Sequence, residues 1–301
     1  MGGGQSLLSG ATDVGVSRRL AALLLTPFGA LLAFGVVVPA AMLFAFSFFH
    51  LSLLELVPGF TFDNYRKVVS TPLYRTYAVN TFLIAAPTAL LSVIGGFVLA
   101  YFLAFRARRS RRFLLIAIVI AFMGSYLAVV YSWRTLSGES GIINSLLQAA
   151  HVTGAPVGFL LFSRIAVVIA EVNFFLPLTT LVIFSSLSSI PPGLEPASRD
   201  LGASAWTTLR RVTLPLAGNA LFGATLFVFF LSAGDYITPV FLGGIGSSAT
   251  FGTLIADQLG TTLNYPLGAA TAFVMFVLFA AVVVVLRVSM RAGGLLPRHT
   301  R

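Results

Sequence analysis

Two carboxylates lie in apolar stretches of this sequence, and both have the chemistry to attract a cation. Glu171 lies two residues before Asn173, and Asp235 is followed directly by Tyr236. A carboxylate inside a membrane costs about 2.5–3.5 kcal/mol on insertion scales, unless it is paired or faces water. A carboxylate next to an aromatic ring suits an ammonium group, through charge and cation–π attraction. These four residues are therefore candidates for a pathway that a cationic substrate follows.

Each of these carboxylates also has a structural interpretation. Glu171 would pair with an arginine of a neighbouring helix, or lie near Arg164, which is seven residues earlier on the same helix face. Asp235 would be a helix-end residue that is exposed to water. A further aromatic residue, Tyr126, suits the aromatic belt at a membrane surface. The sequence leaves these alternatives open.

Residues 188–215 have features of a different kind, which indicate a docking site for another protein. This segment is long for a connection between two helices. A Pro-Pro pair ends the preceding helix, and residues 195–201 fit a short helix with the carboxylate of Glu195 near its positive N-terminal end. Gly202 is suited to the turn that ends this helix.

The second half of the same loop predicts another helix. Ser204 is suited to cap its N-terminus, and Trp206, Leu209 and Val212 then lie on one face. A cluster of apolar side chains on a helix outside the membrane marks an interaction site. The loop therefore predicts a helix–turn–helix that needs a protein partner.

The composition shows which elements must position these residues. Of 301 residues, 57% are hydrophobic and only 9% are charged, and the mean hydropathy is +0.96. Soluble domains carry about 25% charged residues. The apolar residues form long blocks, which predict membrane helices because lipid cannot satisfy an open backbone. The chain has no cysteine, and its three histidines are far apart in sequence, so no metal site is predicted.

Six stretches are long enough to cross a hydrocarbon core of about 30 Å, which takes about 20 apolar residues. The predicted fold class is therefore all-α, a polytopic membrane bundle of six transmembrane helices. Residues 1–19 are expected to form a cytoplasmic N-terminal segment, 20–287 the six-helix domain with the loop 188–215, and 288–301 a cytoplasmic tail. The spans are expected at about residues 20–49, 79–105, 113–133, 165–187, 216–233 and 267–286.

Arginine placement predicts the orientation of the bundle. Fourteen of the nineteen basic residues lie before the first span, between spans two and three, between spans four and five, or after span six. Basic residues are in excess on the cytoplasmic side of membrane proteins. Both termini are therefore expected in the cytoplasm. The net charge of +10 is explained by this bias, and no nucleic acid is expected as a partner.

The loop resembles the cytoplasmic signature of binding-protein-dependent ABC importer permeases (type I, MetI-like fold), an E-A-A-x-x-x-G motif followed by an L-P pair. Glu195, Ala197, Gly202, Leu214 and Pro215 are assigned to this pattern. Pro196 replaces an alanine, which a first helical turn tolerates.

Other segments are similar to the polyamine (spermidine/putrescine) branch of that family. They are residues 80–81, 132–134, 141–144, 199–204, 234–239 and 243–244. The resemblance implies a second permease subunit, identical or homologous, and a pair of ATPase subunits on which the loop docks. It also implies an extracytoplasmic binding protein that delivers the substrate. The residues expected to couple the ATPase to the spans are Glu195, Ala197, Asp200, Leu201, Gly202 and Trp206.

The expected function is that of a permease subunit in a bacterial inner membrane, with a polyamine-like cation favoured as its cargo. ATP and magnesium are expected on the partner ATPase and no cofactor on this chain, because it has no G-x-x-x-x-G-K-[ST] motif. It also has no H-E-x-x-H or G-x-S-x-G motif, so it is not expected to be an enzyme. The alternative is a gradient-driven carrier or channel, which would account for the spans but not for the loop. Such a carrier is often built from inverted repeats, and the sequence shows none.

Overall fold

The computed structural model describes residues 26–52, 55–107, 109–191, 193–244 and 246–296. The chain forms two compact units, Met1–Phe46 and Ser47–Arg301. In the first unit, one apolar helix runs from Thr26 to Phe46. It contains a π-helical turn, η1 (Ala33–Val37), followed by α2 (Val38–Phe46). Its large apolar side chains are exposed, as expected for a helix that faces lipid.

The first expected span, 20–49, is three residues too long at its C-terminal end. A short antiparallel hairpin follows instead, with β1 (His50–Ser52) paired to β2 (Glu55–Val57). The Asn64 side chain donates hydrogen bonds to the carbonyls of Ser47 and Phe49. These carbonyls are thus satisfied outside a helix. Residues 20–25 of this span and the expected segment 1–19 lie outside the described residues.

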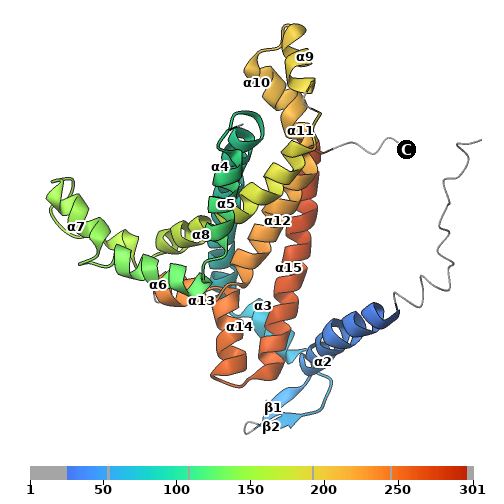
Figure 1. Ribbon diagram of the computed structural model, residues 1–301. Coiled ribbons are helices and arrows are strands. Elements are labelled where there is room, and N and C mark those ends of the chain that lie inside the picture. Colours follow the sequence, from blue (N-terminus) through green and yellow to red (C-terminus); the bar gives the residue numbers. More distant parts are fainter. Residues whose placement is uncertain (1–25, 53–54, 108, 192, 245, 297–301) are drawn as a thin grey trace, which may run out of the picture. The chain divides into compact units, whose positions relative to one another are not determined.

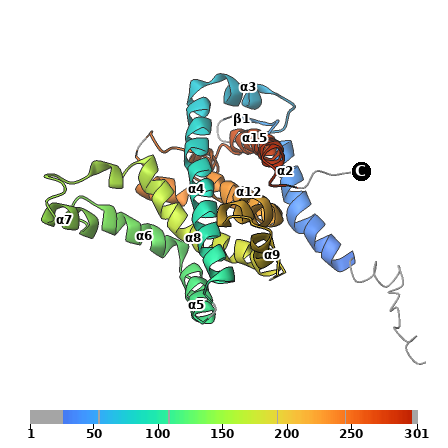
Figure 2. The same ribbon diagram turned by 90° about the horizontal axis from the view of Figure 1, so that it is seen from above.

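Four long helices form the main part of the second unit. They are α4 (Pro72–Phe105), α8 (Arg164–Ser188), α12 (Gly218–Gly234) and α15 (Tyr265–Ala292), and they lie side by side in both ribbon views (Figures 1 and 2). Small residues allow the helices to approach closely. A Cβ atom at Gly96 of α4 would lie 2.3 Å from the Thr179 hydroxyl of α8. The expected spans at 79–105, 165–187 and 267–286 are confirmed as single helices, although α4 and α15 are longer.

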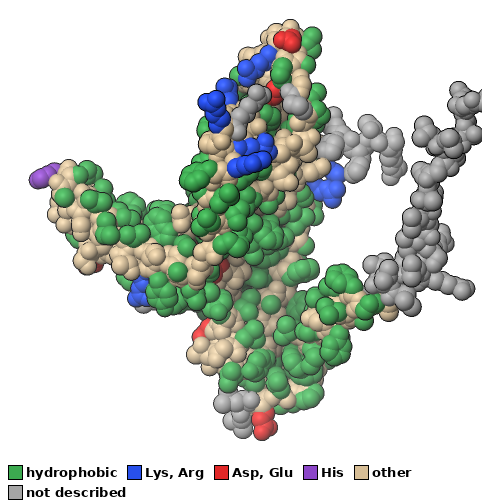
Figure 3. All heavy atoms as spheres, viewed as in Figure 1, with side chains coloured by type: hydrophobic (Ala, Val, Ile, Leu, Met, Phe, Trp, Pro, Cys, Tyr) green, Lys and Arg blue, Asp and Glu red, His purple; other side chains and the backbone are tan. Residues whose placement is uncertain are grey.

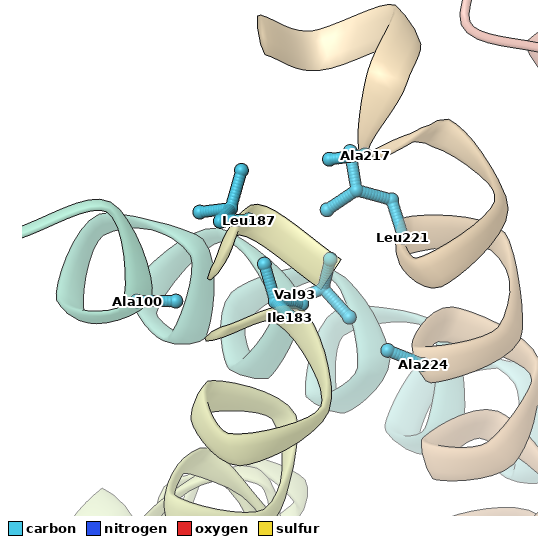
Figure 4. Close-up of a cluster of buried hydrophobic side chains, with 7 residues drawn as sticks. All are labelled: Val93, Ala100, Ile183, Leu187, Ala217, Leu221 and Ala224. Carbon is cyan, nitrogen blue, oxygen red and sulfur yellow. The ribbon is translucent and has the colours of Figure 1, made fainter. Parts of the chain in front are cut away.

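The core between α4, α8 and α12 is built from small and branched side chains. Val93 and Ala100 of α4 pack with Ile183 and Leu187 of α8 and with Ala217, Leu221 and Ala224 at the start of α12 (Figure 4). Because lipid is as apolar as these side chains, close packing rather than exclusion of water holds the helices together. The cluster fixes the position of three helices on which the candidate sites are built.

One of the six expected spans is not a single helix. The expected span 113–133 is divided into α5 (Arg111–Phe122) and α6 (Tyr126–Ser137). The chain bends by 86° between Arg111–Phe122 and the segment Tyr126–Ala149. The Ser125 hydroxyl accepts a hydrogen bond from the amide of Ala128 and starts the new helix after Gly124. α6 and α7 (Ile142–Ala149) project away from the four long helices (Figures 1 and 2). The expected third span is thus a bent pair of helices and not one continuous helix.

The expected fifth span corresponds to α12, which is preceded by a bend of 67°. The elements before the bend are α10 (Ala205–Thr208), the π-helical turn η3 (Leu209–Thr213) and α11 (Leu214–Leu216). By length and composition, the described residues hold four single membrane-spanning helices, or up to six if each bent pair counts as one span.

Short helices complete the second unit. They are α3 (Asp63–Ser70), η2 (Gly158–Leu160), α9 (Leu194–Asp200), α13 (Ile237–Leu242) and α14 (Phe251–Gly260). α9 and α10 lie at one end of the long helices, and α14 lies at the other (Figure 1). Except for the hairpin, the described chain is helical, as the sequence predicts.

The arginine-rich segments meet at the end that carries α9 and α10. Arg111, at the start of α5, donates a hydrogen bond to the hydroxyl of Ser188 and lies over the ring of Phe184. The backbone after α15 approaches the start of α12, where a Cβ atom at Gly218 would lie 1.7 Å from the carbonyl oxygen of Leu295. Figure 3 shows basic side chains gathered at this end. Within the described part of the second unit, the segments before α5, before α12 and after α15, which the positive-inside rule groups together, are thus neighbours.

Candidate functional site

The loop 188–215, called the coupling loop below, forms the expected helix–turn–helix. α9 covers Leu194–Asp200, one residue earlier than predicted. Gly202 has a φ of +84°, a conformation that L-residues with a side chain rarely adopt. The Ser204 hydroxyl accepts a hydrogen bond from the amide of Thr207 and caps α10. A hydroxyl pair, Ser198 with Thr208 at 2.7 Å, joins α9 to the second helix.

The two faces of α9 have different environments. Glu195 is half-buried, and its carboxylate accepts a hydrogen bond of 2.8 Å from the hydroxyl of Tyr101 in α4. Ala197 and Asp200 are exposed, and the side chain of Leu201 is 90% exposed. An apolar side chain this exposed outside the spans marks a surface that a partner can cover.

One detail of the predicted second helix was wrong. Trp206 is 66% exposed, whereas Leu209 and Val212 are half-buried. The chain changes from α-helix to π-helix at Leu209, so the spacing of 3.6 residues per turn on which the prediction depended ends there. Trp206 therefore belongs to the exposed face with Leu201, and Leu209 and Val212 do not.

The register of the signature also needs a correction. Seven positions separate Glu195 from Gly202, whereas the E-A-A-x-x-x-G pattern separates its acid from its glycine by six. Counted back from Gly202, the acidic position is Pro196, which is exposed. Glu195 is one residue earlier, on the face of α9 that contacts α4. Its role therefore has to be argued from its own contacts.

The second candidate site is a cleft beside Asp235. α12 ends at Gly234, and the Asp235 carboxylate accepts hydrogen bonds from the amides of Ile237 and Thr238 at 2.9 and 3.2 Å. It therefore caps the start of α13. The hydroxyl of Tyr126 also donates to this carboxylate. Asp235 is half-buried, so it lies at a helix end as expected but is only partly exposed to water.

Aromatic rings dominate the walls of this cleft, which has a volume of about 390 Å³. The ring of Tyr126 meets that of Phe174 edge-on, with centroids 4.7 Å apart. One carboxylate among aromatic faces is the arrangement that binds an organic ammonium ion. The lining residues are Tyr126, Phe174, Phe175, Phe230, Leu231, Gly234, Asp235 and Tyr236.

Glu171 is fully buried close to this cleft. Its carboxylate accepts hydrogen bonds from the hydroxyls of Thr88 in α4, at 2.9 Å, and Ser232 in α12. It lies close enough to Asp235 for the two carboxyl groups to interact. Among the described residues, its second oxygen has no hydrogen-bond partner. Glu171 thus joins three long helices and places a second acidic group next to the first.

The arginine alternative for Glu171 finds no support in these contacts. Arg164 donates its Nε hydrogen to the carbonyl of Ser247 instead. Asn173 is exposed, and its side-chain oxygen is 3.5 Å from the indole nitrogen of Trp133. The structure therefore places Asp235 and Tyr236 in the cleft and Glu171 close to it, and Asn173 is not among the lining residues.

Sequence reasoning missed several partners of these residues. Thr88 and Ser232 are ordinary polar residues of apolar helices, and nothing in their spacing indicates a common partner. Tyr126 was interpreted as a residue of the interfacial belt. The Gly-Ser pair before it was the available signal, because it indicates a helix break. Tyr101 had no signal, since its contact with Glu195 joins residues 94 positions apart.

Comparison with known proteins decides the family. Residues 79–292 match the family model for the binding-protein-dependent transport system inner membrane component. The chain belongs to this family. It is therefore the permease component of an ABC importer, and the alternative of a gradient-driven carrier is wrong.

Relatives and solved structures agree with this assignment. The chain is 29% identical to the inner membrane ABC transporter permease YdcU of Escherichia coli, over 86% of each protein. It is 27% identical to the spermidine/putrescine permease PotB of the same organism, over 75% of this chain and 81% of PotB. A bacterial ABC transporter that imports the acidic polysaccharide alginate has the same fold, with a TM-score of 0.73 over 91% of this chain and 95% of that one. At 17% identity, this last likeness concerns the fold alone.

Proposed function

We propose that this permease carries a small organic polycation of the polyamine class across the membrane. The observation that supports this cargo is the cleft in which the Asp235 carboxylate lies among Tyr126, Tyr236 and three phenylalanines. An ammonium group there gains both charge attraction and cation–π contacts, which contribute about 0.5–2 kcal/mol each. The likeness to spermidine/putrescine permeases agrees with this chemistry.

Glu171 supplies a second acidic group behind the cleft wall. A buried carboxyl group without a positive partner is costly, and two adjacent ones repel each other when both are charged. A cation that enters the cleft relieves this repulsion. A carboxylate in the cleft also disfavours a polyanion such as alginate, which supports a cationic cargo.

The remaining parts of the transporter follow from the coupling loop. The exposed Ala197, Asp200, Leu201 and Trp206 form a surface that fits a groove on a separate ATPase subunit, where ATP and magnesium bind. Gly202 permits the turn between the two helices. This arrangement requires the arginine-rich end of the second unit to face the cytoplasm, and we expect both termini on that side of the membrane.

Two further partners complete the proposed complex. A second permease subunit, identical or homologous, pairs with this one in the bilayer. A periplasmic or lipid-anchored binding protein delivers the substrate to the end opposite α9. The alginate transporter has been solved in complex with a periplasmic protein, which supports such a delivery step.

The cargo is tested by uptake into proteoliposomes that hold the complete transporter with its binding protein. ATP-dependent uptake of labelled spermidine is expected, and Asp235→Asn should reduce it at least tenfold because the charged anchor is lost. Asp257→Asn is the matched control, since Asp257 is exposed on α14, away from the cleft. ATP-driven uptake of an uncharged or acidic solute in place of amines would contradict the proposal.

A further inference from the structure

The hydrogen bond between Tyr101 and Glu195 joins a membrane helix to the coupling loop. Tyr101 lies near the end of α4, and its ring packs between Phe97 and Phe105, with centroid distances of 6.1 and 4.9 Å. Its hydroxyl reaches the first turn of α9. Among described residues, this is the one side-chain hydrogen bond that the Glu195 carboxylate makes. The bond therefore fixes α9 to α4 at a single polar contact.

The space around the Tyr101–Glu195 hydrogen bond is only partly filled by other side chains. Two cavities, of about 350 and 300 Å³, adjoin Glu195 and Pro196. Phe105 lines both of them, and Arg106 and Arg199 line the larger one. α9 is therefore not packed tightly around Glu195. The Ser198–Thr208 pair joins α9 to the second helix of the loop, and the Tyr101–Glu195 hydrogen bond joins it to α4.

α4 extends from this contact to the buried Glu171, which lies close to the cleft. Thr88, which donates to Glu171, is thirteen residues before Tyr101, or about 20 Å along a helix. Between them, α4 is packed against α8 and the start of α12 through the cluster of Figure 4. A rigid helix transmits a displacement from one end to the other. The two polar contacts of α4 therefore link α9 to the acidic groups near the cleft.

We propose that Tyr101 is a positioning residue, which transmits a movement of α9 to α4 and so to the cleft. This inference rests on the proposed function, in which α9 docks on the ATPase. It differs from the family signature, because Glu195 precedes the acidic position of that signature and faces α4. The ATPase displaces α9 through its exposed face, and the hydrogen bond between Glu195 and Tyr101 transmits this displacement to α4.

The absence of cysteine from the chain allows a direct test that does not depend on the cargo. Leu231 lines the cleft, so a Leu231→Cys variant reports cleft accessibility through its rate of maleimide labelling. The rate is measured in the assembled transporter, with cysteine-free partners, without nucleotide and after trapping with ATP and vanadate. In the parent we expect the two rates to differ severalfold. Tyr101→Phe keeps the ring but loses the hydroxyl, and the two rates should become equal.

Three further variants separate a positioning role of Tyr101 from an effect on general stability. Tyr131→Phe removes a hydroxyl from an exposed tyrosine outside the cleft and should leave the nucleotide dependence unchanged. Glu195→Ala breaks the same hydrogen bond from outside the spans, so it tests the inference if Tyr101→Phe fails to assemble. Glu195→Gln keeps an acceptor and should restore most of the nucleotide dependence.

A double variant shows whether Tyr101 acts through Glu195. If it does, Tyr101→Phe combined with Glu195→Ala should be no worse than either change alone. Additive losses, or a normal rate difference in Tyr101→Phe, would overturn the inference, as would a parent whose cleft does not respond to nucleotide. If the ATPase does not assemble with the permease at all, the proposed docking of α9 is wrong. If only amine uptake is missing, the proposed cargo alone is wrong.

Discussion

Glu171 shows at the scale of single residues how an intramembrane acid is held by hydroxyl groups, with no basic partner among the residues that the structure describes. Its carboxylate is 0% exposed and accepts hydrogen bonds from Thr88 and Ser232. The sequence predicted the importance of this residue, because an acid in an apolar stretch is costly. It could not predict the partners, since they are hydroxyls 83 and 61 positions away. A hydroxyl in a membrane helix has many alternative partners on its own backbone.

The two roles of Glu171, structural and electrostatic, are separable by substitution. Glu171→Gln keeps an acceptor for both hydroxyls but removes the acid, so the melting temperature of the purified permease should stay close to the parent value while spermidine uptake falls severalfold. Glu171→Leu leaves both hydroxyls without this acceptor, at about 1–3 kcal/mol each, and should also lower the melting temperature. Unchanged uptake by a stable Glu171→Gln variant would show that this acid does not act on the substrate.

At the scale of elements, the sequence predicts which segments are helical better than it predicts where they bend. Spans with uniform apolar composition, such as α8 and α15, were placed within a few residues because length and hydropathy determine them. The break between α5 and α6 follows from two small residues, Gly124 and Ser125, inside a continuous apolar run. A hydropathy value averaged over a whole span does not detect such a pair. The π-helical turn η3 escaped prediction for a similar reason, since a periodicity argument assumes 3.6 residues per turn.

Close approach of α4 and α8 is the element-level feature that is simplest to test. Gly96→Val would bring a side chain into the Thr179 hydroxyl and the backbone of Thr180. Overpacking of this kind costs about 1–3 kcal/mol, so the melting temperature in detergent should fall and transport should be lost with it. Gly223→Val is the matched control on α12, because nothing lies within 4 Å of a Cβ atom there. Equal stability of the two variants would contradict the packing described for α4 and α8.

At the scale of the whole molecule, the basic side chains, the acidic groups and α9 occupy defined positions along the length of the second unit. The arginine-rich segments and α9 lie at one end, and α14 at the other (Figures 1 and 3). The acidic groups near the cleft lie between these ends, on α8 and at the end of α12. Sequence alone predicted the side on which each loop lies, because arginine bias is a property of composition. It could not assemble the cleft, because its walls come from α6, α8 and α12.

The orientation itself is testable because the chain has no cysteine. Ser110→Cys places a thiol among the arginines before α5, and Asp257→Cys places one on α14; both positions are exposed. A maleimide that cannot cross the membrane should label the Asp257→Cys variant in intact spheroplasts and the Ser110→Cys variant only in inverted vesicles. Ala197→Cys, on the exposed face of α9, should label like Ser110→Cys, and an ATPase docked on α9 should protect it. Labelling of Ser110→Cys from outside would reverse the topology and place α9 where no cytoplasmic ATPase can reach it.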